Sequence, residues 1–165
     1  MTGPAADFAR RLDAVETRLQ SHAGAEIAPD ALTAPDLPTG ERWEAGQVWA
    51  HVAEFIPYWL GEAGRVAEHG GDSPVLFGRT KSDPERIAAI ARDRYRDRRL
   101  LWNRTAGDIA RLRAFLSGLQ PPAWETRGLH PSLGEMDLSR IVDEFLVGHL
   151  EQHADQLDGL VPARN

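Results

Sequence analysis

The sequence predicts an all-α protein, a four-helix bundle whose helices are joined by long connections. Four segments carry apolar side chains at the spacing of three or four residues that places them on one face of a helix. Stretches rich in proline and glycine separate these segments, and no alternating strand pattern or hairpin turn is present. The 165 residues suffice to bury one hydrophobic core, so we expect a single domain over residues 1–165.

The first two helices are predicted at roughly residues 5–22 and roughly residues 44–69. Their apolar faces consist of Phe8, Leu12, Val15 and Leu19 in the first helix and Val48, Val52, Phe55 and Trp59 in the second. Residues 24–42, between the two helices, contain three prolines and two glycines and cannot form regular structure. A connection of this length in a small domain is usually functional or lies over the surface.

The third helix is predicted to begin at Pro84, because proline suits the first turn of a helix. Ser82 or Asp83 can serve as its N-cap. The pattern predicts either one unbroken helix to about Leu116 or a break near Gly107.

The fourth helix is predicted to start after Asp137, and two histidines continue its apolar face. This face consists of Leu138, Val142 and Phe145, followed at four-residue steps by His149 and His153. Both imidazoles should therefore point into the bundle. A buried imidazole needs a partner for each ring nitrogen, which leaves two interpretations open. Either a metal ion binds both histidines, or each one forms a hydrogen bond with a carboxylate or a backbone carbonyl.

The segment "GHLEQH", residues 148–153, has the histidine spacing of the zinc-protease motif H-E-x-x-H. That motif requires a glutamate directly after the first histidine, where this chain has Leu150. Glu151 follows one position later, about 200° around the helix from His149. The sequence therefore does not match a protease of this type.

A catalytic zinc site typically uses three protein ligands and keeps one position for water or substrate. His51 is the candidate third ligand, because it lies beside the apolar face of the second helix, between Val48 and Phe55 in angle. Glu54 lies on the same side as His51 and is the candidate catalytic residue, able to orient an imidazole or to handle protons. The alternative for Glu54 is a solvated helix face.

Three further histidines, His22, His69 and His130, lie at predicted helix ends or in loops. Solvent or a helix terminus can satisfy their ring nitrogens, so none of them is expected to bind a metal. His130 is the one that could contact substrate, because a loop at the mouth of a bundle borders its interior.

Composition limits the classes of function. The net charge of −6 argues against bulk nucleic-acid binding. The absence of cysteine excludes disulfides, cysteine zinc sites and thiol catalysis by the protein itself, so any reacting thiol must come from a cofactor or substrate. The N-terminus, "MTGPAADFARRLDAVE", has no apolar segment typical of a secretory signal, and no apolar run approaches the ~20 residues that span a bilayer. We expect a cytoplasmic protein without nucleic-acid or membrane partners.

Three stretches together resemble the DinB-like, or YfiT-like, superfamily of metalloenzymes. They are Trp43 followed by His51 in "EAGQVWAHVAEF", the loop "HPSLGEMD", and the last helix "LSRIVDEFLVGHLEQHADQLDGL". The resemblance extends from the first helix to Leu160. It implies an up-down-down-up bundle and a divalent metal, zinc or nickel, held by His51, His149 and His153 at one end of the bundle.

The family includes bacillithiol transferases and mycothiol-dependent maleylpyruvate isomerase, which use low-molecular-weight thiols. Isomerase-type relatives can carry a glutamate at the first ligand position of the last helix, where this chain has His149. The resemblance implies a thiol S-transferase, or a related thiol-dependent enzyme, that acts on a small electrophile through a metal-bound thiolate. A metal-hydroxide hydrolase is a variant of this hypothesis. The alternative class is a non-catalytic bundle that binds a metal or small ligand, or forms a homodimer, without turnover.

Overall fold

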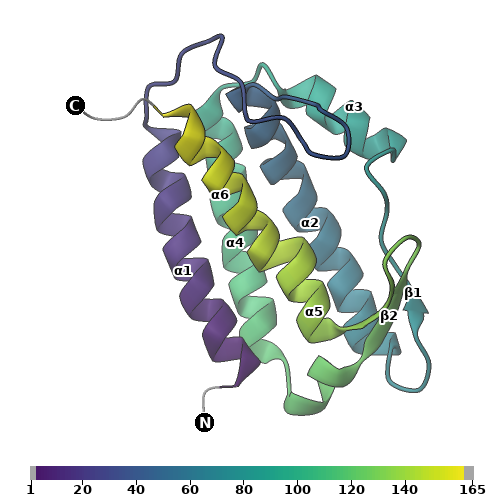
Figure 1. Cartoon of the computed structure of the whole chain (residues 1–165). Coiled ribbons are helices and arrows are strands. Elements are labelled where there is room, and N and C mark those ends of the chain that lie inside the picture. The colour runs from purple at the N-terminus through teal and green to yellow at the C-terminus, as the bar shows by residue number, and fades with distance from the viewer. Residues whose placement is uncertain (1–2, 162–165) are drawn as a thin grey trace.

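Four long helices run side by side in the computed structural model, which describes residues 3–161 (Figure 1). They are α1 (Pro4–Ala23), α2 (Ala45–His69), α4 (Arg98–Gly118) and a last helix made of α5 (Leu138–Val142), a π-helical turn (Asp143–Val147) and α6 (Gly148–Leu160). The first and last helices run in one direction and α2 and α4 in the other, as Figure 1 shows. The expected four-helix bundle with up-down-down-up topology is therefore confirmed.

The apolar faces predicted from the sequence form one continuous core between the four helices. Side chains that are less than 2% exposed come from every helix, among them Leu12, Leu19, Phe55, Ile56, Ile109, Leu112, Leu116, Ile141 and Leu146. Complete burial of a leucine or phenylalanine side chain contributes roughly 1.5–3 kcal/mol to stability. None of the helices within residues 3–161 is long and apolar enough to cross a membrane.

The segment predicted as one third helix forms two helices, α3 (Pro84–Asp93) and α4, joined by a short turn. Neither an unbroken helix nor a break at Gly107 is found, because Gly107 lies inside α4. Asp97 starts α4 by accepting a backbone hydrogen bond at 2.7 Å. The turn packs against the start of α2, where a Cβ on Gly46 would lie 2.0 Å from the carbonyl oxygen of Arg94. This close approach fixes the break between α3 and α4.

A small sheet flanks the bundle beside the last turns of α2 (Figure 1), although the sequence predicted only loops there. Its strands are β1 (Val75–Leu76), β2 (Arg127–His130) and β3 (Gly134–Asp137). The central strand β2 pairs parallel with β1 and antiparallel with β3. None of these three strands has more than four residues, so none could show an alternating pattern. The sheet lies beside α5 and the end of α2 (Figure 1) and holds His130 at the edge of the bundle.

Candidate metal centre

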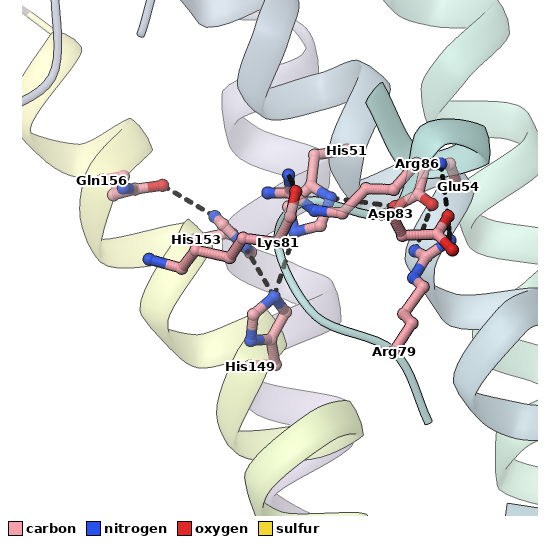
Figure 2. A network of polar contacts seen from close by, with 9 residues as sticks. All are labelled: His51, Glu54, Arg79, Lys81, Asp83, Arg86, His149, His153 and Gln156. Carbon is pink, nitrogen blue, oxygen red and sulfur yellow. Dashed lines mark hydrogen bonds and ion pairs between the residues drawn. The ribbon is translucent and has the colours of Figure 1, made fainter. Parts of the chain in front are cut away.

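Three histidines from two helices converge inside the bundle. His51 projects from α2, and His149 and His153 project from α6 toward it (Figure 2). The Nε2 atom of His149 lies 3.1 Å from Nε2 of His51 and 3.0 Å from Nε2 of His153. Metal–nitrogen bonds of about 2.1 Å place ligand nitrogens roughly 3–4 Å apart, so this spacing is compatible with one metal ion.

The outer nitrogens of two of these rings are fixed by hydrogen bonds. His51 Nδ1 donates to Oε2 of Glu54 at 2.9 Å, and His153 Nδ1 donates to Oε1 of Gln156 at 2.7 Å. A neutral imidazole that carries its proton on Nδ1 has a lone pair on Nε2. The lone pairs of His51 and His153 therefore both point toward His149. This donor set fits a divalent metal better than a set of histidines that merely satisfy one another.

Burial keeps the three rings neutral. It lowers the pKa values of His51 and His149 well below their ordinary range, and repulsion from His153 lowers both further. Burial likewise lowers the pKa of His153 to about 4, although the hydrogen bond to Gln156 opposes this change. Because all three pKa values are lowered, the rings are neutral at neutral pH, and the neutral imidazole is the form that binds metals.

A π-helical turn positions His149. The N–H of Gly148 donates to the carbonyl of Asp143, five residues earlier. A Cβ on Gly148 would lie 2.4 Å from that carbonyl oxygen, so glycine is needed where the turn rejoins α6. Turns of this kind are frequent at functional sites. The sequence analysis predicted one regular helix here, and Gly148 directly before His149 is the only signal that could have indicated otherwise.

Glu54 is a buried partner of His51. One carboxylate oxygen accepts from His51, and the other pairs with Arg79, whose guanidinium lies 3.9 Å from the ring centroid of Tyr58. Burial raises the pKa of Glu54, while the charge of Arg79 opposes the rise. The solvated helix face considered for Glu54 is therefore not found. Glu54 orients His51, and its effect on turnover stays a prediction.

Two cavities open onto the histidines. The larger has a volume of about 530 Å³ and the smaller about 180 Å³, and His51 and His149 border both. Trp59, Phe145 and His130 form an aromatic wall of the larger cavity, with Trp59 and Phe145 stacked at 4.1 Å between centroids. The histidines are thus accessible to a small molecule from a largely apolar space.

The remaining histidines lie away from the three converging rings. His22 Nε2 contacts Asp158 at 2.6 Å, and His69 is exposed at the end of α2. His130 is buried, contrary to the expectation of a solvated loop residue. Its Nε2 donates to the carbonyl of Arg79 at 3.1 Å, and its Nδ1 accepts from two backbone N–H groups. His130 therefore contributes a ring face, and no free nitrogen, to the larger cavity.

Sequence reasoning missed three residues beside the histidines, namely Arg79, Arg86 and Gln156. Gln156 follows His153 by three positions, as Glu54 follows His51. That repeated spacing on a helix could have revealed it. Arg79 and Arg86 reach the site from the loop before α3 and from its first turn, and no pattern in the sequence relates these positions to α2 or α6.

Known structures share this fold. YfiT from Bacillus subtilis, described as a probable metal-dependent hydrolase with an unusual four-helix-bundle topology, aligns with a TM-score of 0.73 at 14% identity, covering 94% of this chain and 85% of that protein. This chain has the YfiT-like fold. The mycothiol-dependent maleylpyruvate isomerase aligns with a TM-score of 0.68 at 16% identity. A histidine-to-alanine variant of that enzyme aligns with a TM-score of 0.67 at 17% identity. No family model and no curated protein sequence matches the chain.

The YfiT-like fold agrees with the superfamily resemblance read from the sequence. The chain covers only 61% of the isomerase's length, so that enzyme contains much that this chain does not align with. At 14–17% identity the likeness establishes the fold and leaves the reaction to be argued from the site.

Proposed function

We propose that this chain is a cytoplasmic, divalent-metal-dependent enzyme that transfers a low-molecular-weight thiol, mycothiol or bacillithiol, to a small electrophile. The observation that carries the proposal is the convergence of three neutral imidazoles at a cavity large enough for a small ligand. Nε2 of His149 lies 3.1 Å from Nε2 of His51 and 3.0 Å from Nε2 of His153. His51, His149 and His153 would hold the metal, with zinc and nickel as the expected ions. When bound, such a metal supplies Lewis acidity that lowers the pKa of a thiol or water beside it.

The residues of the chain divide the remaining work. Glu54 and Gln156 keep Nε2 of His51 and His153 directed at the centre. Trp59 and Phe145 supply an apolar wall on which the apolar part of a substrate can pack. The thiol sulfur gives its electron pair to the new carbon–sulfur bond, its proton passes to solvent, and the leaving group departs with the pair of the broken bond.

One observation favours a thiol as the nucleophile: two of the structures that share the fold are of an isomerase described as mycothiol-dependent. Because the chain has no cysteine, such a thiol would be a separate molecule. Hydrolysis with water as nucleophile is the second candidate, favoured by the description of YfiT as a probable metal-dependent hydrolase.

Metal analysis of untagged protein, followed by two assays on the metal-loaded form, tests the proposal. The first assay follows conjugation of mycothiol or bacillithiol to a chromogenic chloro-dinitrobenzene, and the second follows hydrolysis of p-nitrophenyl acetate. We expect about one divalent metal ion per chain and metal-dependent conjugation. Hydrolysis alone would establish the second candidate, and metal binding without either activity would establish a non-catalytic bundle.

A further inference from the structure

Arg86 is a cation beside the histidines, and its guanidinium carbon lies 5.7 Å from the ring centroid of Trp43. It belongs to the first turn of α3, where its backbone N–H donates to Asp83 at 2.9 Å. Its half-buried side chain extends toward His51, as Figure 2 shows, and Nη1 donates to the carbonyl of Lys81 at 2.9 Å. Within residues 3–161, no carboxylate oxygen lies within 4.0 Å of its guanidinium nitrogens.

The two neighbouring cations are both paired. Arg79 is buried against Glu54, and Nζ of Lys81 lies 3.0 Å from Oδ2 of Asp36. Burial lowers the pKa of Arg86, although the negative charge of Glu54 opposes this change. Glu54 and the other acids that act on Arg86 lie beyond ion-pair distance, so the half-buried guanidinium has no direct counter-ion and a ligand anion would supply one.

Arg86 lies where an anion that pairs with it would also be close to the three histidines. Arg86 borders both the larger and the smaller cavity, as do His51 and His149. Among the residues that the structure describes, Arg79, Lys81, Arg86 and one acid, Glu144, are the charged groups that border the larger cavity. An anion in this cavity would therefore meet positive charge and the unpaired N–H groups of Arg86.

We infer that Arg86 anchors a carboxylate group of the substrate next to the three histidines. A guanidinium presents a planar fork that matches the two oxygens of a carboxylate, and one such charge balances the one unpaired arginine. The electrophile then carries a carboxylate at one end and an apolar part that packs on Trp59 and Phe145. This inference rests on the proposed function, because it takes the cavity at the histidines as the substrate site.

Benzoate and benzamide test the inference, because they share a ring and differ in the charge of the head group. Isothermal titration of the zinc-loaded full chain should show benzoate binding at least about tenfold more tightly than benzamide. Arg86→Gln should reduce this preference to the part that zinc itself produces, without changing zinc content or the unfolding temperature. Arg10→Gln is the matched control, because it removes the same charge from an exposed arginine of α1 and should keep the preference. Zinc itself favours benzoate over benzamide in every sample, so the part of the preference that Arg86 supplies is the difference between the wild type and Arg86→Gln.

Arg86→Lys keeps the charge and loses the fork, so it should bind benzoate more weakly than the wild type and more tightly than Arg86→Gln. Equal binding of benzoate and benzamide by the wild type, which needs no variant, would overturn the inference. It would also be overturned if Arg86→Gln kept the full preference, or if inorganic phosphate bound through Arg86 more tightly than benzoate. A lack of thiol conjugation would remove the proposed function and leave the benzoate preference in place, so the two failures are distinguishable.

Discussion

His51 and Glu54 lie one turn apart on α2 and share a buried hydrogen bond of 2.9 Å between Nδ1 and Oε2. The second oxygen of Glu54 pairs with Arg79, so both oxygens of the carboxylate are bonded to protein groups. Glu54 is not among the residues that border the two cavities at the histidines. Its influence on a ligand therefore passes through the residues that it contacts: the orientation and basicity of His51, and Arg79, which borders the larger cavity.

Glu54→Gln should leave the metal bound and lower turnover by about 10–100-fold. The amide oxygen can still accept from His51 Nδ1, but the negative charge that supports the ring and pairs with Arg79 is lost. Metal analysis and initial rates, measured on the same preparation, check both parts. Glu151→Gln is the control, because Glu151 faces away from the centre and pairs with Arg11 of α1 at 2.7 Å. Unchanged turnover in Glu54→Gln would show that the negative charge of Glu54 does not contribute to catalysis.

His149→Ala should reduce metal content severely, because two imidazoles cannot replace a three-ligand site. His149→Glu should retain the metal, because a carboxylate oxygen is also a zinc ligand. Metal per chain after dialysis against a weak chelator measures both variants beside the wild type. Equal metal content in His149→Ala and the wild type would end the assignment of these histidines as ligands.

Much of the fold could be predicted because burial leaves a periodic trace. Leu12, Leu19, Phe55 and Val142 were placed in the core from spacing alone, and all are less than 2% exposed. The inward direction of His149 and His153 followed from the same period. The short sheet left no such trace, because its strands pair through the backbone and are too short to show alternation.

The surroundings of the histidines were harder to predict because they depend on contacts between distant segments. Arg79 and Glu54 pair across 25 positions, and nothing in the local sequence of either residue indicates the other. The π-helical turn was missed because hydrophobic spacing does not distinguish it from regular helix over five residues. The break at Asp97 was missed because the helical pattern continues on both sides of it.

The stability of the metal-free protein should fall as the pH is lowered from 7 to 5. The pKa of His153 is about 4 in the folded chain and 6.5 ordinarily, so the unfolded chain takes up protons more readily in this window. The contribution of the neutral His153 ring to the free energy of unfolding is fully present above pH 6.5 and is lost as the pH falls toward 4. Between pH 7 and 5 this loss is roughly 2 kcal/mol from His153 alone. His51 and His149 act in the same direction. Urea unfolding with a chelator present measures this loss, and His153→Phe should reduce it; equal stability at both pH values would contradict the burial of neutral rings.

Gly148→Ala should destabilise the protein and disturb His149 at the same time. The added Cβ would lie 2.4 Å from the carbonyl oxygen of Asp143, so the π-helical turn must shift to admit it, at a cost of roughly 1–3 kcal/mol. Gly107→Ala is the matched control within α4, because nothing lies within 4 Å of its added Cβ. Alanine there should stabilise the helix by roughly 0.5–1 kcal/mol. Chemical unfolding should show lower stability for Gly148→Ala and higher stability for Gly107→Ala. Metal analysis should show lower metal affinity only for Gly148→Ala. An unchanged stability of Gly148→Ala would show that the turn does not require glycine.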